Sequence, residues 1–523
     1  MSQQQVIQNI VGGTRRADMN VINMSECQNM YFETSGEGAS SSSLLRSIKG
    51  LDKVLDIDGI PRGRFVASRG PDGNPRLFVV YFNKLYVIDK DTDTGLYIKT
   101  FVGNLSNITT PVGMCETGGE GSAHPYIVVV DGRTVHIAST IEPASTIAST
   151  FRNITLPLNT NNQYIQPTHC AYQYGYLCVN DNLSDGFYQS YQYPFETTDT
   201  SGNISYDVFT YDPLSDTTAE NGFVTYAEWM PDNITAMIGT GSRMVVLGKR
   251  SYQSFHYNND INQPFVSADT AASAIGIQAI YSLATIGSFT FWLGASDIGQ
   301  NAIYVLDVDS INRISNPDIE REISAMTNAS DAVAQCWVEN GHMFYSLTFI
   351  TDNKTITYDV LEKKWHSRVS TDPNKNISNA WRYNYAVMYD NKIWFLTTDA
   401  LCIQSNDSWL EHDGNPIIRL RICGAIINDY SPFMIDSLFL FINNGYTKNP
   451  IVRPKLMLRF SRDGTSFSNE RIGYMGRQGE YSYVTEFTRL GMGRIWNFEI
   501  SCSENIDFTL MSAKILANVC GRF

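Results

Sequence analysis

The feature that most restricts the fold of this 523-residue sequence is a β-hairpin pattern that recurs along its middle. Successive strand-like runs there start 50, 47, 70, 45, 54 and 42 residues apart. A recurrence of roughly 40–50 residues is the length of one four-stranded propeller blade. The sequence therefore predicts an all-β chain built on a β-propeller of six or seven blades, without a WD or kelch signature. The runs start at Leu77, Ile127, Tyr174, Met244, Phe289, Met343 and Tyr385.

The turns inside the first two hairpins are the most specific local signals. The first hairpin, Leu77–Ile88, contains the polar pair Asn83–Lys84, and the second, Ile127–Ile137, contains Asp131–Gly132. Asp-Gly favours a type I′ turn, because both central residues of that turn need a positive φ. We expect a two-residue turn in each hairpin.

The two ends of the chain differ from the middle and predict three domains. Residues 1–65 have few strand-like runs and are expected to form an extended N-terminal arm. Residues 66–408 form the predicted propeller, with an insertion near 182–221 that accounts for the longest step. Residues 409–523 contain strand-like runs at other spacings and predict an antiparallel β-sandwich. These runs are Ser437–Ile442, Lys455–Phe460, Tyr481–Phe487, Trp496–Ser501 and Phe508–Leu516.

One short helix is predicted, over Asn316–Met326. Pro317 suits the first turn of a helix, and acidic residues follow it there. Ile319, Ile323 and Met326 share one face at helical spacing, so we expect that face to pack on the sheets.

Composition excludes several classes of protein. The 39 basic and 53 acidic residues give a net charge of −14, which argues against a protein that binds nucleic acid through its charge. No apolar run reaches the roughly 18 residues that a membrane span needs, and the N-terminus lacks the pattern of a signal peptide, so we expect no membrane insertion. Nine cysteines without a CxxC pair predict reduced thiols rather than a disulfide framework.

We expect no metal site, because the seven histidines are dispersed. Only His169, Cys170 and Cys178 lie close in sequence, and zinc sites need a fourth ligand and tighter spacing. The glycine-rich segment 118–121 lacks the lysine of a phosphate-binding loop, and we interpret it as a surface turn. No cofactor is expected.

Catalysis is not expected either, because no nucleophile motif is present. The segment Ser461–Phe467 resembles the Asp-box turn of sialidase propellers, which is itself a structural turn. A glycosidase needs two carboxylates, or a tyrosine equivalent, at one pocket, and nothing in the sequence brings two together. A glycan-binding or glycan-hydrolysing propeller is the alternative hypothesis. The aromatic tract Phe187–Tyr193 fits glycan or partner binding as well as local packing.

Basic residues gather modestly near both ends, in the segments 46–69 and 471–494. Contacts between subunits, or solvated faces, are favoured over contacts with DNA. The residues predicted to contact neighbouring subunits are Arg46, Arg62, Arg489, Arg494 and Trp496.

Three stretches, in order, resemble the packaged-DNA stabilisation or tail hub proteins of short-tailed bacteriophages. The first runs from Asn29-Met30-Tyr31 through Leu45-Arg46-Ser47 and Gly50 to Gly59-Ile60-Pro61-Arg62-Gly63. The second runs from Tyr252–Phe255 through Gly276-Ile277 and Phe291–Gly294 to Ile314-Ser315 and the predicted helix. The third runs from Leu456–Phe460 and Asp463-Gly464 to Thr488–Arg494 and Trp496-Asn497-Phe498.

This resemblance implies a structural virion protein of the phage tail, assembled in the bacterial cytoplasm. It implies a homo-oligomeric ring, hexameric by analogy, below the portal and adaptor proteins. Such a nozzle extends the DNA channel, retains packaged double-stranded DNA without reading its sequence, and docks tail fibres or spikes and a needle. With the net charge of −14, it leads us to expect a channel lined by Asp, Glu, Asn, Thr and Ser.

Overall fold

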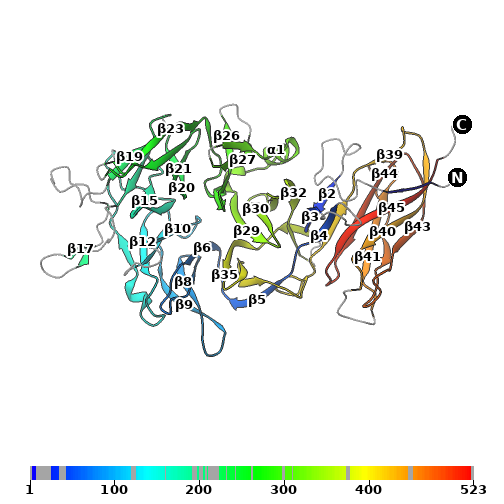
Figure 1. The fold of residues 1–523 in the computed structure, drawn as a ribbon, viewed down its shortest axis with the longest axis horizontal. Coiled ribbons are helices and arrows are strands. Elements are labelled where there is room, and N and C mark those ends of the chain that lie inside the picture. The colour runs from blue at the N-terminus through cyan, green and yellow to red at the C-terminus, as the bar shows by residue number, and fades with distance from the viewer. Residues whose placement is uncertain are drawn as a thin grey trace.

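The computed structural model places two β-rich bodies side by side, a propeller and a sandwich, with both chain ends on the sandwich (Figure 1). It describes residues 3–6, 25–34, 43–118, 125–159, 161–190, 197–198, 204–205, 209, 223–230, 232–241, 243–260, 263–296, 301–308, 310–372, 377–445 and 452–519. The predicted all-β class is confirmed.

Seven blades follow one another around the propeller, each a meander of four main strands from the centre to the rim. The first three are β6 (Pro61–Ala67), β7 (Arg76–Tyr81), β8 (Lys84–Lys90) and β9 (Tyr97–Asn104); β10 (Gly113–Thr117), β11 (Tyr126–Val130), β12 (Val135–Ser139) and β13 (Arg152–Ile154); and β14 (Cys170–Gln173), β15 (Tyr176–Asn180), β16 (Gly186–Gln189) and β19 (Phe223–Tyr226).

The remaining four blades include one with a split inner strand and one that uses a strand from the N-terminal region. They are β20 (Ile234–Thr240), β21 (Arg243–Gly248), β22 (Tyr252–Tyr257) and β23 (Phe265–Ser273); β24 (Ile275–Ile277) with β25 (Ala284–Ile286), β26 (Phe289–Ser296), β27 (Asn301–Asp307) and β28 (Ser310–Arg313); β29 (Val333–Glu339), β30 (His342–Phe349), β31 (Lys354–Asp359) and β32 (Lys364–Ser367); and β35 (Asn384–Tyr389), β36 (Lys392–Leu396), β37 (Ala400–Gln404) and β5 (Leu51–Asp56).

The blades close into a ring. The inner strand β35 of the seventh blade contacts β6 of the first blade, and inner strands of other neighbouring blades contact each other around the axis. Between the fourth and fifth blades, β20 contacts the 3-10 turn η4 and β21 contacts β24. The rim strand of the seventh blade is β5, which pairs antiparallel with β37. Residues 51–56 therefore complete the propeller, although the sequence assigned them to an arm. Pairing between segments so distant in sequence leaves no local periodic signal.

The predicted hairpins are present with shifted turns. In the first blade the two-residue turn is Phe82–Asn83, and Phe82 has a φ of +52°. In the second blade four residues, 131–134, join the strands, and only Gly132 among them has a positive φ. The Asp131 carboxylate accepts hydrogen bonds from the backbone N–H groups of Arg133 and Thr134, which stabilises the longer loop.

The predicted helix is α1 (Pro317–Ser324), between the fifth and sixth blades. The Asn316 side chain accepts a hydrogen bond from the Ile319 N–H at 2.9 Å and caps the helix. Ile319 and Ile323 are fully buried on the face that faces the blades, as predicted. Short 3-10 turns are η2 (Ile147–Thr150), η4 (Ile280–Ser282) and η5 (Ala329–Asp331).

The region predicted as an insertion begins later than expected, because residues 186–189 form β16 inside the third blade. Within the segment that follows, β17 (Thr197–Thr198) pairs with β18 (Ile204–Ser205), and most of its other residues lie outside the described part of the chain. A second small hairpin, β33 (Val369–Asp372) with β34 (Ile377–Ala380), lies between the last two blades.

The sandwich consists of two sheets around one apolar core that contains Trp496, Phe498 and Phe460. One sheet has the order β3 (Met30–Thr34), β4 (Ser43–Ser47), β45 (Thr509–Val519), β40 (Phe433–Ile442) and β43 (Thr485–Gly493), with β1 (Gln3–Val6) paired to β45. The other has β2 (Glu26–Gln28), β38 (Arg419–Ile422), β44 (Ile495–Cys502), β41 (Lys455–Ser461) and β42 (Arg471–Tyr474), with β39 (Ile426–Ile427) paired to β44.

The two bodies share a sheet. Strand β2 pairs with β32, at the rim of the sixth blade, and on its other side with β38 of the sandwich. In the N-terminal region, β1 thus pairs within the sandwich, β2 lies between the two bodies, β3 and β4 return to the sandwich, and β5 completes the seventh blade. Blade and sandwich form one ten-stranded sheet through β2.

No helix among the described residues is long and apolar enough to cross a membrane. The eight described cysteines are unpaired thiols, six of them buried, and Cys520 lies outside the described residues.

Candidate functional site

Two clusters of buried polar side chains join parts of the fold that are separate in sequence. One lies where the first two blades meet, and the other lies where the propeller meets the sandwich. We describe the first as the blade cluster (Arg62, Asn107, Thr110, Asp131 and His136) and the second as the seam (Asn29, Glu339, His342, Asp359 and Arg368).

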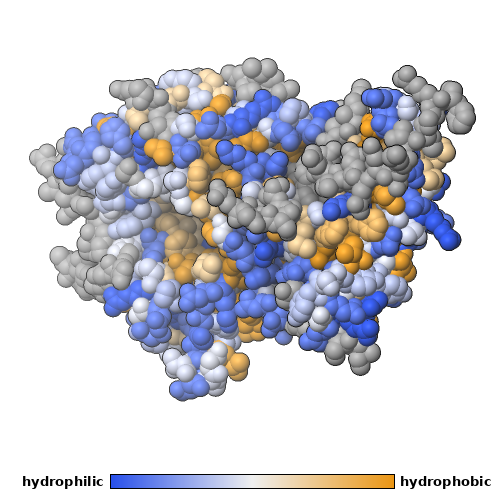
Figure 2. Space-filling view, turned by 45° about the vertical axis from the view of Figure 1, so that its right-hand side comes forward, coloured by the Kyte–Doolittle hydropathy of each residue, from blue (hydrophilic) through white to orange (hydrophobic). Residues whose placement is uncertain are grey.

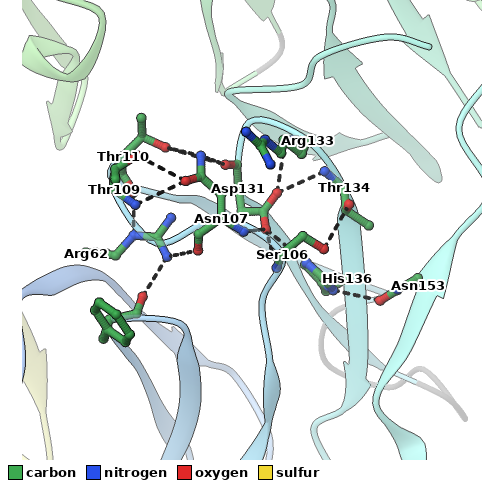
Figure 3. Close-up of polar contacts among 11 residues, drawn as sticks. Arg62, Ser106, Asn107, Thr109, Thr110, Asp131, Arg133, Thr134, His136 and Asn153 are labelled. Carbon is green, nitrogen blue, oxygen red and sulfur yellow. Dashed lines mark hydrogen bonds and ion pairs between the residues drawn. The ribbon is translucent and has the colours of Figure 1, made fainter.

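Arg62 anchors the blade cluster (Figure 3). Its side chain is 1% exposed, and its guanidinium donates hydrogen bonds to the backbone carbonyls of Phe82, Asn107 and Thr110, at 2.5–2.6 Å. These carbonyls belong to a turn of the first blade and to the connection into the second. Arg62 therefore ties the two blades together, and burial lowers its pKa although Asp131 opposes this effect.

Asp131 is the acceptor at the centre of the cluster. It is fully buried and accepts hydrogen bonds from four backbone N–H groups at 2.8–3.0 Å and from His136 Nε2 at 3.2 Å. Burial alone raises the pKa of Asp131, but the hydrogen bonds from His136 and the backbone outweigh it and hold the pKa well below its usual range. Asp131 therefore fixes the connection 106–107 against the turn 131–134.

Ser106 lies beside His136 and Asp131 of the blade cluster, yet the geometry of these three residues differs from a catalytic triad. His136 Nδ1 faces Asn153 Oδ1 at 2.7 Å, and His136 Nε2 faces Asp131. The Ser106 hydroxyl accepts a hydrogen bond from Thr134 at 3.2 Å. A base must reach the proton of its nucleophile, so this arrangement positions loops.

Other blades also contain an aspartate that, like Asp131, accepts hydrogen bonds from backbone N–H groups. These aspartates lie on the side of the ring where the chain passes from one blade to the next. In each case the carboxylate joins the connection into a blade to the turn between the second and third strands of that blade. Asp181 accepts from Gln166 N in the third blade, Asp232 from Arg250 N in the fourth, and Asp352 from Thr327 N and Asn328 N in the sixth, at 2.5–3.1 Å. These bonds make that face of the ring rigid.

Asn29 holds the seam together. Its Nδ2 donates to the carbonyls of Val369 at 2.9 Å and Ile418 at 2.8 Å, and its Oδ1 accepts from the Val369 N–H at 2.9 Å. One asparagine thus bonds to the end of the sixth blade and to the strand that enters the sandwich. Asn29 has a φ of +54°, a conformation that asparagine tolerates better than most residues.

Arg368 lies in an aromatic cage beside Asn29. Its guanidinium carbon lies 4.6–4.9 Å from the ring centres of Trp337, Phe344 and Trp381. Its Nη2 atom lies 3.4 Å from the Oε2 atom of Glu339, and both side chains are at most 2% exposed. The other oxygen of Glu339 has no hydrogen-bond partner in the described part of the chain. This buried charge pair is stabilised by cation–π contacts.

His342 and Asp359 form a second buried pair in the seam, with Nδ1 and Oδ2 2.7 Å apart. Burial lowers the pKa of His342, but the hydrogen bond and charge of Asp359 outweigh it and raise the pKa above 6.5. A raised histidine pKa contributes stability that is fully present below the unfolded-state pKa and is lost as the pH rises through the folded-state pKa.

We therefore expect the stabilising effect of His342 to be larger at pH 5.5 than at pH 8. The difference in unfolding free energy between the native chain and H342Q, measured in urea at several pH values, should shrink as the pH rises across this interval. A difference that stays constant, or that grows with pH, would contradict the pairing. The variant D359N should remove the same pH dependence.

The five residues predicted as subunit contacts fall into two groups. Arg46 pairs with Glu33 at 2.8 Å and is partly exposed, and Arg489 and Arg494 are exposed on the sandwich. Arg62 and Trp496 are 1% and 0% exposed. The structure corrects the prediction for these two, because a side chain inside its own subunit has no surface to offer a neighbour.

The other sequence candidates are dispersed or structural. His169 stacks on Tyr281 with ring centres 5.8 Å apart, and burial lowers its pKa to about 4. No group of three or more potential metal ligands lies together in the residues that the structure describes. In the segment that resembles an Asp-box, Asp463 accepts from Thr465 N and Ser466 N at 2.8 Å, which makes a turn. Residues 119–121 and 191–193 lie outside the described residues.

Sequence reasoning missed the seam. Glu339 and His342 face each other across the turn between β29 and β30, but Arg368 directly follows β32, and only the fold brings it to them. One signal was available, namely charged residues inside otherwise apolar, strand-like runs. Such residues are rarely buried without partners.

Comparison with known proteins gives one informative match. The model of the family described as Phage_stabilise, "Bacteriophage P22 Gp10, beta-propeller", matches residues 9–401. That match ends within β37, so it covers the first two stretches of resemblance and not the third. No curated protein matches the chain.

Two solved structures show limited similarity. The extracellular domain of a hybrid two component system from B. thetaiotaomicron has a TM-score of 0.39 at 13% identity, over 76% of this chain and 46% of that one. The WD40 domain of Toxoplasma gondii coronin has a TM-score of 0.36 at 8% identity, over 73% of this chain and 87% of that one. The chain thus spans less than half of the first structure.

Proposed function

Because the chain belongs to the bacteriophage P22 Gp10 family of β-propeller proteins, we propose that it is a ring-forming hub subunit of a phage tail. In this role it extends the DNA channel below the portal and adaptor, retains packaged DNA, and docks receptor-binding fibres or spikes and a needle. The family match over residues 9–401 is the observation that carries the proposal. The role is structural and non-catalytic.

Rigidity of the subunit supports this role. A channel wall in a tail must keep its shape under the load of packaged DNA. Seven closed blades leave only short edges, and the buried carboxylates described above fix the connections on one face. Figure 2 shows mostly hydrophilic residues over the outside of the face in view, with hydrophobic residues gathered in recessed areas.

The seam supports the role in a second way. A subunit that contacts neighbours on several sides transmits force between its two bodies. Here that force passes through a continuous sheet, through β2, rather than through a flexible linker. Cyclic rings use heterologous contacts, in which two different faces of each subunit meet, and two rigidly joined bodies provide such faces.

The proposal is tested with phage particles assembled without this chain. We expect heads that package DNA and then lose it, measured as DNA-filled against empty heads by electron microscopy and by nuclease sensitivity. Supplying the chain in trans should restore filled, infectious particles. Stable DNA-filled heads without the chain would refute the proposal.

The net charge of −14 leads to a prediction about the channel. DNA must leave quickly, and a wall of Lys and Arg would bind its phosphates and retard it. In an experimental structure of the assembled tail, we expect Asp, Glu, Asn, Thr and Ser to line the bore. A bore lined by Lys and Arg would contradict this expectation and leave the ring role itself intact.

A further inference from the structure

A cavity of about 240 Å³ opens between the outer halves of the third and fourth blades. Neighbouring blades diverge towards the rim, so side chains must fill the gap between their outer strands, and here they leave it open. Its walls come from β16 and β19 on one side and from β22 and β23 on the other, the strands near the labels β19 and β23 in Figure 1.

The two walls carry matching polar pairs. On the third blade, Gln189 Nε2 donates to the Thr225 hydroxyl at 2.8 Å, and on the fourth, Gln253 Nε2 donates to the Ser267 hydroxyl at 2.7 Å. Gln189 is fully buried and Gln253 is 7% exposed. Polar groups at this depth are normally satisfied, because an unsatisfied buried acceptor costs free energy.

One acceptor in this cavity lacks a partner. The Oε1 atom of Gln189 is buried and has no hydrogen bond in the described residues. It belongs to a side chain that lines the cavity, so this acceptor lies next to the space that a ligand would occupy. The amide of Gln189 is held in place by its bonds to Thr225 and to the Phe187 carbonyl, so the acceptor is preorganised.

The remaining lining defines the ligand class. Phe255 and Phe265, almost fully buried, provide apolar surface at the base, and Tyr226, Glu228 and Gln263 lie around the opening. None of the described residues that line the cavity is a Lys or an Arg, so they offer no charge partner to a phosphate or carboxylate ligand. The lining combines amide and hydroxyl groups with aromatic rings. A neutral ligand with several hydroxyl groups and an apolar face can hydrogen-bond to the first and pack on the second.

The volume sets the size of the ligand. Pockets for drug-sized molecules run to roughly 300–1,000 Å³, so a cavity of about 240 Å³ fits a smaller unit, such as one sugar ring. We propose that this cavity binds a neutral pyranose unit of a glycan. The inference does not depend on the proposed tail function, since it rests only on the lining of the cavity.

The test uses saturation-transfer difference NMR on the full chain with the methyl glycosides of glucose, galactose, mannose and N-acetylglucosamine in millimolar excess. At least one glycoside should receive saturation from the protein and bind saturably. The variant Q253M/S267A removes one polar pair while keeping its shape, and should weaken that binding at least tenfold. The variant E228Q changes an exposed residue and should not disturb folding. It should weaken glycoside binding several-fold.

The matched control is S346A/T357V, which removes a buried hydroxyl pair 2.9 Å apart in the sixth blade. It should leave glycoside binding unchanged. Absence of transfer to all four glycosides overturns the proposal. It is also overturned if binding survives unchanged in both Q253M/S267A and E228Q.

Discussion

Replacing Glu339 with alanine is expected to lower the free energy of unfolding of the propeller by about 3–5 kcal/mol. The substitution leaves the Arg368 guanidinium charged and 1% exposed, without its only carboxylate within 4 Å among the described residues. Removing one partner of a buried pair costs far more than the pair itself contributes, because the remaining charge stays desolvated. The aromatic cage lessens this cost but supplies no full negative charge.

Urea unfolding of the full chain, followed by tryptophan fluorescence, measures the effect, since Trp337 and Trp381 form part of the cage. The matched control is E322A, which removes the partner of Lys354 in a pair 3.9 Å apart with the lysine 54% exposed. Exposed pairs contribute roughly 0–1 kcal/mol, so E322A should change little.

A double variant shows whether E339A loses stability because Arg368 is left unpaired or because the glutamate side chain no longer packs there. In E339A/R368M neither charge remains, so most of the lost stability should return if the unpaired charge is its cause. If E339A and E339A/R368M are equally unstable, the packing of the glutamate side chain matters instead. If E339A unfolds like the native chain, Arg368 does not depend on Glu339.

The sequence predicted the propeller because each blade is built from hairpins that are local in sequence. In the first six blades, the recurring run starts at the second strand, as at Leu77 and Met343. In the seventh it starts at the inner strand β35, which explains the shortest step of 42 residues. The capped helix α1 was predictable for the same reason, since cap and apolar face lie within eleven residues.

What the sequence could not predict depends on contacts between distant segments. Asn29 lies about 340 residues from Val369 in sequence, and β5 lies about as far from β37. The alternation of apolar and polar residues along a strand also does not reveal which polar residues become buried. Arg62 was therefore assigned to the surface. The glutamines of the rim cavity, Gln189 and Gln253, belong to different blades and meet only in the fold.

The second large loss of stability is expected where β5 closes the propeller ring. Leu51 is 3% exposed and packs with Ile48, Trp381 and Phe395. We expect L51D to lower the free energy of unfolding by at least about 4 kcal/mol, because a carboxylate there either stays charged without a partner or must be protonated at neutral pH. The loss of the buried leucine adds to this cost.

The residues just before β5 are held in place, so the strand cannot shift to bring a carboxylate at position 51 into water. A Cβ atom on Gly50 would lie 2.5 Å from the Leu410 carbonyl oxygen, and the Gly50 N–H donates to the Ser408 carbonyl at 2.8 Å. The strand is therefore held against the segment that leads to the sandwich, and Leu51 cannot turn outwards without breaking these bonds. Detachment of β5 from β37 is the expected response.

Hydrogen exchange separates this detachment from global destabilisation. In L51D the amides of β37 should exchange much faster than those of the first blade, because losing the rim strand exposes one edge of β37. The control K53D places the same carboxylate on an exposed position of β5 and should leave both exchange patterns unchanged. If amide exchange in L51D is accelerated equally in all blades, the substitution destabilises the whole propeller, and β5 has no special role in closing the ring. Unchanged exchange in β37 would mean that the ring stays closed without β5.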